Sequence, residues 1–329
     1  NIFEIAVSHH PGRVTERHRL SRPKFQQFFA KHLPATVLLA ACSSAHHWAR
    51  TLRHLGHSVI LLPPHTVRPY VTRNKTDRTD AKAILEAFRN EDVLPVPIKT
   101  IDQHVLASLH RYRSAWLAER TARINTTRGV LRELGHAIPV GSRRLVSAVY
   151  ALLGEPDAIP EALLPSLTAA CEEISSFEMR IRDSEQQLEV IARDHPVAQR
   201  LMTIPGIGFL SATALIAFVG DIRRFPSGRH FASYLGLTPR EHSSGSRRHL
   251  GSISKRGDTY LRMLLVHGAR SILWAAKNID HPDRLRVWAL EREHSSGHNK
   301  AAVALANKLA RIAWAVWKRN CTFVSIKEV

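Results

Sequence analysis

Long apolar segments are missing from this sequence. No run approaches the roughly 20 apolar residues that are needed to span a bilayer. The most apolar segments are 211–219, which is too short, and 301–317, which carries Lys308 and Arg311. We therefore expect no membrane attachment, and no secretory signal is recognised. Because the chain begins at Asn1 and not at methionine, upstream residues are expected to have been removed or not included.

Cysteines are scarce and widely separated, at positions 42, 171 and 321. This spacing indicates neither a disulfide framework nor a cysteine zinc site, and it agrees with a reducing cytoplasm. No sequence period of about 20 to 50 residues recurs, which excludes a solenoid. With 329 residues, 44% of them hydrophobic, the chain suits two or three domains.

Acidic residues are few compared with basic ones. The sequence has 28 Asp and Glu against 47 Lys and Arg, which gives a net charge of +19 and an isoelectric point near 10.7. This surplus favours a polyanion as partner, and nucleic acid is the leading candidate. A basic protein without such a partner is the alternative.

Residues 1–100 have an α/β pattern. Short β-rich runs at 2–7, 36–41 and 57–63 alternate with helical patterns at 23–33 and 45–56, which predicts a sheet with helices against its faces. Residues 12–20 could complete a hairpin. A charged segment then leads into a helix that is predicted to start near Thr79.

Residues 101–198 predict long helices. Ile101, Val105, Leu109, Tyr112 and Trp116 form an apolar stripe on a basic helix, and an apolar heptad rhythm that starts at Ile174 is interrupted only by Ser184. The pattern predicts a two-helix or coiled-coil hairpin. Its role is either that of a spacer or dimerisation arm, or direct contact with nucleic acid.

Residues 199–329 predict helices punctuated by glycine, ending with a helix at 300–320. The string IPGIG places Gly206 and Gly208 between two helices, where backbone N–H groups could meet a phosphate as in a helix-hairpin-helix module. An ordinary tight turn between helices explains the same string equally well.

Asp77 and Asp80 lie three residues apart at the start of a predicted helix, so that their carboxylates share one face. Such a pair could hold Mg²⁺, and the nearby Arg73, Lys75 and Arg78 would suit a phosphate backbone beside the metal. The alternative is a pair of acidic residues that stabilises the helix N-terminus.

The hexamer REHSSG occurs twice, at 240–245 and 292–297. The first copy presents Ser243 and Ser244 in a predicted loop with basic neighbours that could bind and polarise a phosphodiester: Arg240, Arg247, Arg248, Lys255 and Arg256. The second copy precedes the last helix, so its serines are predicted to cap that helix. His294 and His298 lack a third ligand, which makes a metal site there a weak hypothesis.

Several strings together resemble the transposases of the insertion sequence one-ten family, in particular its eleven-eleven subgroup. The strings are ACSSAHHWAR, NKTDRTDA, IPGIG, residues 231–262 and the helical tail, so the resemblance runs nearly end to end. It implies an α/β plus α chain with three parts: a RuvC-like (RNase H type) domain with a DEDD acidic set at 1–100, a coiled-coil linker at 101–198, and a C-terminal serine transposase domain at 199–329.

The resemblance also implies site residues. Asp77 and Asp80 match the third and fourth acidic residues, and Ser244 matches the nucleophilic serine. The family's first acidic residue would precede this chain, and Ala40 occupies the position of the second, a glutamate. With two of four carboxylates, Mg²⁺ would be held weakly. Ala40 would be either an engineered substitution or natural decay, and the chain could be inactive.

The leading hypothesis is therefore an RNA-guided DNA recombinase of the bacterial cytoplasm, associated with the nucleoid. The family implies a non-coding bridge RNA, donor and target double-stranded DNA, Mg²⁺, and a homo-oligomer, either a dimer or a tetramer, with a site that could be composite between subunits. A phosphoserine intermediate agrees with the lack of a Walker A string. The alternatives are a metal-dependent RuvC-type nuclease or junction resolvase that uses water, and a decayed nucleic-acid scaffold.

Overall fold

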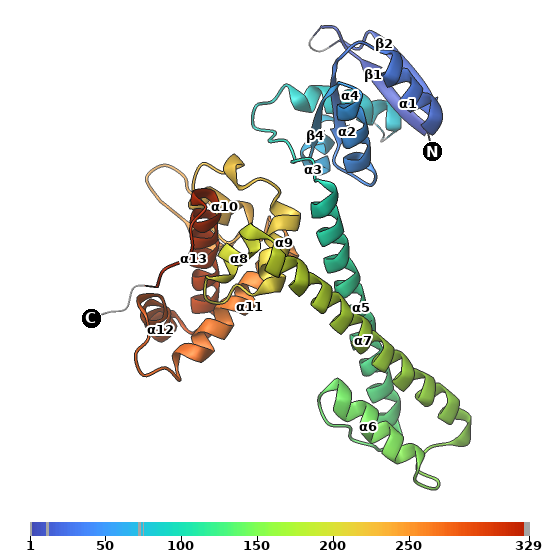
Figure 1. The fold of residues 1–329 in the computed structure, drawn as a ribbon, viewed down its shortest axis with the longest axis vertical. Coiled ribbons are helices and arrows are strands. Elements are labelled where there is room, and N and C mark those ends of the chain that lie inside the picture. The colour runs from blue at the N-terminus through green and yellow to red at the C-terminus, as the bar shows by residue number, and fades with distance from the viewer. Residues whose placement is uncertain (1, 11–12, 72–73, 75, 326–329) are drawn as a thin grey trace. The chain divides into compact units, whose positions relative to one another are not determined.

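The computed structural model describes residues 2–10, 13–71, 74 and 76–325. The chain folds into two compact units, one ending at Thr100 and the other beginning at Ile101 (Figure 1). The first unit combines strands with helices and the second is almost entirely helical, which confirms the mixed α/β class. Within the described ranges, no helix has both the length and the apolar character needed to cross a membrane.

The first unit contains two pairs of strands. Strands β1 (Ile2–Val7) and β2 (Glu16–Ser21) are antiparallel, and β3 (Thr36–Ala40) and β4 (Ser58–Leu62) are parallel. The predicted strands and the hairpin are confirmed. The prediction that these strands form one sheet is not confirmed, because among the described strands no backbone hydrogen-bond ladder joins the two pairs.

The helices of this unit surround the strand pairs. They are α1 (Arg22–Lys31), α2 (Ala45–His54), the short α3 (Pro64–Val67) with the 3₁₀ turn η1 (Arg68–Tyr70), and α4 (Asp77–Phe88). Helix α2 connects the parallel strands β3 and β4, as parallel pairing requires. Its buried Trp48 packs edge-on against Phe25 of α1, with ring centroids 4.8 Å apart, so an aromatic cluster ties the two helices together.

The second unit begins with two long antiparallel helices, α5 (Ile101–Glu133) and α7 (Leu164–Asp194), with α6 (Ser142–Leu153) and η2 (Glu161–Leu163) between them (Figure 1). Three ion pairs set their register: Arg113–Glu185, Arg120–Glu178 and Arg123–Glu173. As numbers rise along α5, those of the partners fall along α7, which fixes the antiparallel direction.

The rhythm predicted on α7 is confirmed, since Ile174, Ile181 and Leu188 are buried, and the interrupting Ser184 is buried with them. The stripe predicted on α5 is confirmed only in part, at Leu109, which packs against the core. Ile101 is 59% exposed and Tyr112 is 61% exposed, whereas Leu106, Ala107 and His110 face the core. Packing against the other helices therefore buries a face of α5 that differs from the one predicted by residue spacing alone.

The remaining elements form a helical body. They are α8 (Pro196–Met202), α9 (Phe209–Val219), η3 (Ile222–Arg224), α10 (Gly228–Tyr234), β5 (Pro239–Glu241), β6 (Leu250–Ile253), α11 (Thr259–Ala276), α12 (Arg284–Ser296) and α13 (His298–Arg319). Helix α9 is apolar on nearly all sides and is therefore buried among the others. The core joins α9, α11 and α13 to the adjoining ends of α5 and α7.

The IPGIG string forms the turn between α8 and α9. A Cβ built on Gly206 would lie 2.6 Å from the carbonyl oxygen of Gly268 on α11, and one built on Gly268 would lie 2.0 Å from that of Gly206. Two backbones touch here because neither residue has a side chain. Gly206 therefore has a packing role, while Gly208 is exposed at the N-terminal end of α9.

Candidate functional site

The first REHSSG copy lies in a β-hairpin and not in an irregular loop. Strands β5 and β6 pair antiparallel, and at the tip Ser244 and Arg247 exchange backbone hydrogen bonds of 3.3 and 3.2 Å. The turn between them consists of Gly245, with a φ of +57°, and Ser246. Residues 239–252 are all exposed. The hairpin thus projects Ser244 into solvent, where a large substrate can reach it.

The two adjacent serines have different surroundings. The Ser243 hydroxyl donates a hydrogen bond of 2.7 Å to Glu241 and accepts one of 3.2 Å from the backbone N–H of His249. Within the part of the chain that the structure describes, the Ser244 hydroxyl makes no hydrogen bond. Ser243 therefore braces the hairpin across its strands, whereas the Ser244 hydroxyl does not.

Glu241 organises the base of the turn. It accepts the Ser243 hydrogen bond and pairs with Arg248 at 3.2 Å. The Ser243 hydrogen bond, followed by the charge of Arg248, lowers the pKa of Glu241 below its usual value. The carboxylate therefore stays ionised at neutral pH and keeps both partners in place.

The ends of the hairpin are attached to the helical body. Arg262 of α11 donates hydrogen bonds of 3.2 Å to the carbonyl oxygens of Leu235 and Gly257, one on each side of the hairpin. Asn307 of α13 donates another, of 3.1 Å, to Leu237. These contacts fix the direction in which the exposed hairpin leaves the body.

The basic residues predicted around the hairpin are all exposed: Arg240, Arg247, Arg248, Lys255 and Arg256. Arg248 is paired with Glu241, and Arg240 donates to the carbonyl oxygen of Ser254 at 3.3 Å. Arg247 lies at the tip beside Ser244. A phosphodiester at Ser244 would therefore meet positive charge on the same hairpin.

Asp77 and Asp80 lie in the first turn of α4, as the sequence predicted, with the helix beginning two residues before Thr79. The cap is supplied by threonines: the Thr79 N–H donates to the Thr76 hydroxyl at 3.2 Å, and the Thr76 N–H donates to the Thr79 hydroxyl at 2.9 Å. Neither aspartate forms an ion pair or hydrogen bond with a described residue. Side-chain capping therefore leaves both carboxylates available for another ligand.

Two free carboxylates one helical turn apart fit Mg²⁺, which commonly takes one or two protein carboxylates and completes its shell with water and phosphate. No cluster of three or more His, Cys, Asp or Glu residues suited to a metal occurs in the ranges described. Ala40, at the end of β3, brings no ligand, although α4 packs against β3.

Of the three basic residues predicted near Asp77 and Asp80, the structure describes only Arg78. Arg73 and Lys75 lie outside the described residues. Arg78 is exposed, and its carbonyl oxygen accepts a hydrogen bond of 3.3 Å from Arg17 of β2. Among the residues described, the Arg78 side chain forms no ion pair or hydrogen bond, so no such contact competes with a phosphate.

The second REHSSG copy does not cap the last helix, so that prediction is wrong. Its serines end α12, where both hydroxyls donate to the carbonyl oxygen of Arg292, and Gly297, at a φ of +80°, then redirects the chain into α13. His298 pairs with Glu293 and not with His294. This copy therefore has the same sequence as the first, but it lies at the end of a helix and not in a hairpin.

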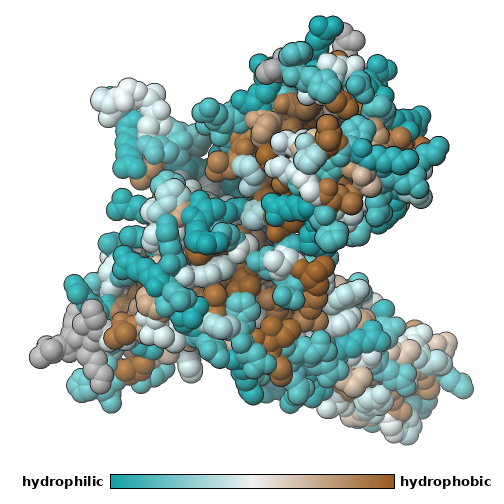
Figure 2. Space-filling model, turned by 45° about the horizontal axis from the view of Figure 1, so that its top comes forward, coloured by the Kyte–Doolittle hydropathy of each residue, from teal (hydrophilic) through white to brown (hydrophobic). Residues whose placement is uncertain are grey.

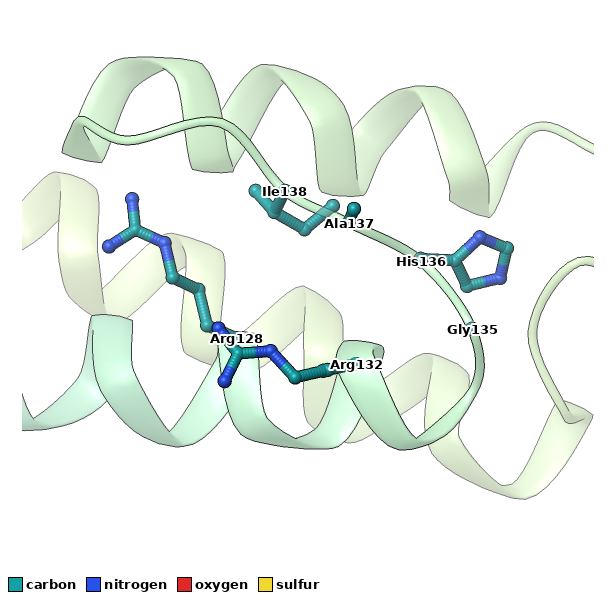
Figure 3. A pocket seen from close by; sticks show the side chains of 6 residues that line it. All are labelled: Arg128, Arg132, Gly135, His136, Ala137 and Ile138. Carbon is teal, nitrogen blue, oxygen red and sulfur yellow. The ribbon is translucent and has the colours of Figure 1, made fainter.

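A small cavity of about 160 Å³ lies at the end of the α5–α7 pair and is lined by Arg128, Arg132 and residues 135–138 (Figure 3). Arg128 donates to the carbonyl oxygen of Pro139 at 2.9 Å, and His136 bonds to that of Ala158 at 2.9 Å. The polar groups here hold the connecting loop, and none of the lining residues carries a carboxylate or hydroxyl.

Sequence reasoning missed Glu241, Arg262 and a buried polar group on α5. His110 is 1% exposed and bonds to the Tyr260 hydroxyl at 2.9 Å and to that of Thr213 at 3.0 Å. Burial, and then the charge of Arg113, lowers its pKa to about 4. The Gly245–Ser246 pair is a turn signal that could have predicted the hairpin, although not the contacts of Glu241.

Two models of transposase families match parts of this chain. Residues 198–282 match the family model described as Transposase IS116/IS110/IS902 family. Residues 3–136 match a second model, described as Transposase, of the DEDD domain of IS110 elements. The first match covers α9 to α11 with the hairpin, and the second covers the unit that carries Asp77 and Asp80.

Transposases that match this chain over most of their length support the same family. The chain is 41% identical to a probable family 20 transposase of Pseudomonas aeruginosa, over 98% of this chain and 95% of the relative. It is 36% identical to the transposase for insertion sequence element IS1111A of Coxiella burnetii (98% and 88%) and 38% identical to that for IS1328 of Yersinia enterocolitica (98% and 96%). The chain therefore belongs to the IS116/IS110/IS902 family of transposases.

Proposed function

We propose that this transposase cuts and rejoins DNA through a covalent phosphoserine intermediate at Ser244, assisted by a divalent metal at Asp77 and Asp80. The observation that carries the proposal is the contrast between the two serines of the hairpin. Ser243 is held by Glu241 and His249, whereas Ser244 is exposed with a free hydroxyl. Exposure lets a polymeric substrate reach the Ser244 oxygen, and no hydrogen bond to a described residue has to break before that oxygen attacks.

In the proposed step, the Ser244 oxygen forms a bond to phosphorus as the bond from phosphorus to a deoxyribose oxygen breaks. The hydroxyl proton leaves the serine, and the departing oxygen takes up a proton. One phosphodiester is replaced by another, so reversal of the step by a second DNA end rejoins the strands without ATP. Arg247, next to Ser244 at the tip, would stabilise the negative charge that develops on the phosphate.

Asp77 and Asp80 would hold the divalent metal, Mg²⁺ in this proposal. When bound, the metal supplies positive charge that favours a deprotonated hydroxyl and stabilises a phosphoryl group under attack. The capping by Thr76 and Thr79 supports this role, because it leaves the two carboxylates unused by the helix. Mg²⁺ held by only two carboxylates would bind weakly, and Ala40 adds no ligand.

The wider scheme is also a proposal: a RuvC-like fold for the first unit, a non-coding bridge RNA that pairs with donor and target DNA, and a homo-oligomer. The net charge of +19 supports polyanionic partners. Hydrophilic residues predominate over the face seen in Figure 2, with hydrophobic ones between them. Base pairing would then carry the sequence specificity, with protein contacts made mainly to the nucleic-acid backbones.

The proposal is tested by trapping the intermediate. The chain is incubated with bridge RNA, Mg²⁺ and nicked DNA substrates, and protein–DNA adducts are separated on a denaturing gel. Ser244→Ala should abolish the adduct, whereas Ser295→Ala in the second hexamer should leave it unchanged. Cleavage that gives free 5′-phosphate ends and no adduct would instead favour a nuclease that uses water.

Ala40 favours a second candidate, a nucleic-acid-binding scaffold that has lost its chemistry. The variant Ala40→Glu separates the two. A transposase should gain adduct yield from a third carboxylate, and a scaffold should form no adduct. Adduct formation in Ala40→Glu that disappears on adding Ser244→Ala would exclude the scaffold.

A further inference from the structure

A second basic surface lies on the helical body, in a groove between the start of α10 and α13. The groove is open to solvent, has a volume of about 580 Å³ and is lined by Arg229 from α10 and by Lys308, Arg311 and Trp314 from α13. None of these residues belongs to the hairpin or to the acidic pair. We refer to this feature as the α10–α13 groove.

The groove is preformed by tight packing. A Cβ built on Gly228 would lie 3.1 Å from both the Cα and the carbonyl oxygen of Arg311, so the glycine lets α10 approach α13 closely. The Trp314 indole N–H and the Lys318 ammonium both donate to the carbonyl oxygen of Phe225, at 3.1 and 3.2 Å. These contacts fix the wall of the groove before any ligand arrives.

Among the residues that the structure describes, the cations of the groove form no ion pairs. Arg229 and Arg311 are exposed and form no ion pair with a described residue. Lys308 is half-buried, with its ammonium 3.9 Å from the centroid of the Trp288 ring on α12. By contrast, the close-packed arginines Arg113, Arg120 and Arg123 of α5 each pair with a glutamate of α7.

Further positive charge surrounds Lys308. Burial lowers the pKa of Lys308 most, and the charges of Arg284, Arg311 and Arg292 lower it further, whereas the charge of Glu291 raises it. The arrangement therefore places several like charges together at a cost in folding free energy. A bound polyanion would remove that cost, since each phosphate would offset part of the mutual repulsion.

We propose that the α10–α13 groove docks the sugar–phosphate backbone of duplex DNA, with Arg229, Lys308 and Arg311 on successive phosphates. Charge complementarity selects a polyanion, and membership of a transposase family selects DNA. The surface is independent of the proposed chemistry at Ser244, because it would hold DNA whether or not a covalent bond forms. RNA is the competing occupant, and the test distinguishes the two.

The test compares two double variants of the whole chain by fluorescence anisotropy with a labelled DNA duplex, over a range of salt concentrations. Arg229→Gln with Arg311→Gln removes two charges from the groove. Arg143→Gln with Arg144→Gln removes two exposed charges from α6, at the far end of the α5–α7 pair. Thermal unfolding of both variants checks that each remains folded.

Each lost phosphate contact should reduce the slope of log K against log salt by about 0.9, which corresponds to about a fivefold loss of affinity at 0.15 M salt. The groove variant should therefore bind about thirtyfold more weakly, with a slope smaller by about 1.8. The α6 variant should bind like the unaltered chain.

Equal affinities for the two variants, or no DNA binding by the unaltered chain, would overturn the proposal. A structured RNA run in parallel gives the third arm, and a loss confined to RNA would reassign the groove. Ser244→Ala should bind duplex DNA with unchanged affinity. If it does so while the adduct test fails, the groove stands and the phosphoserine proposal falls.

Discussion

The carboxylate of Glu241 accepts a hydrogen bond of 2.7 Å from the hydroxyl of Ser243, and this contact separates the roles of two adjacent serines. One serine is part of the hairpin's internal structure. The next, Ser244, has a free hydroxyl on an exposed turn. Of the two adjacent serines, only Ser244 therefore keeps a hydroxyl without a hydrogen bond to a described residue.

The first prediction concerns the brace itself. Because the pKa of Glu241 is lowered, the brace is fully formed above the ordinary value of 4.5 and is lost as the pH falls through the lowered pKa. The backbone amide of His249, which donates to Ser243, should shift in NMR spectra over that acidic range. Glu241→Gln should remove the titration. A His249 amide that titrates identically in Glu241→Gln would contradict the assignment.

The second prediction concerns Arg262, which bonds to the carbonyl oxygens on both sides of the hairpin. Arg262→Met should loosen the hairpin and slow adduct formation about tenfold or more, since misplacement of a reacting group is costly. DNA affinity should remain close to that of the unaltered chain. Arg270→Met, also on α11, is the control, and it should have no effect on the rate.

The third prediction concerns His110, whose pKa falls from 6.5 to about 4 because it is buried. Between these values the unfolded chain binds a proton that the folded chain does not, so stability falls as the pH decreases. Urea titrations should show the free energy of unfolding drop by roughly 2 kcal/mol from pH 7 to pH 5. His110→Asn should lack this component, and a pH dependence equal to that of the unaltered chain would refute it.

The fourth prediction separates the capping residues of α4 from its carboxylates. Thr76→Ala removes half of the capping box and should lower the free energy of unfolding by about 1 kcal/mol. Asp80→Asn should change it by less than about 1 kcal/mol, yet abolish binding of Mn²⁺ used as a spectroscopic probe for Mg²⁺. Unchanged Mn²⁺ binding in Asp80→Asn would rule out the proposed metal site.

The fifth prediction compares the two glycines of IPGIG. Gly206→Ala would push a Cβ into the backbone of Gly268 and should destabilise the body by about 3 kcal/mol. At Gly208 an added Cβ meets nothing within 4 Å, so Gly208→Ala should change stability by less than about 0.5 kcal/mol. Chemical denaturation of both variants measures the difference, and equal losses would show that the close approach is unimportant.

The sequence alone predicted elements whose partners are local. The strand and hairpin assignments at 2–21 hold because β1 and β2 pair with each other across a short connection. The face of α7 was predicted because its apolar residues recur regularly along the helix, and Ile174, Ile181 and Leu188 are indeed buried. The face of α5 was not, because its partners Thr213 and Tyr260 lie about 100 or more residues away and draw a histidine into the core.

In the candidate site, too, the sequence alone does not reveal contacts between residues that only the fold brings together. The motifs single out Asp77, Asp80 and Ser244 as candidates, but they do not reveal which residues cap the helix or which serine is braced. Those distinctions depend on Thr79 and His249, whose contacts form only once the turn and the hairpin have closed. The α10–α13 groove was missed altogether, because Arg229 and Arg311 are 82 residues apart in the sequence.

The most direct measurement is mass spectrometry of peptides from the DNA adduct trapped on a nicked substrate. The account predicts a single modified peptide, with the nucleotide remnant on the Ser244 oxygen, and no adduct from Ser244→Ala. A remnant on Ser243 or on another residue, or an adduct that persists in Ser244→Ala, would contradict it.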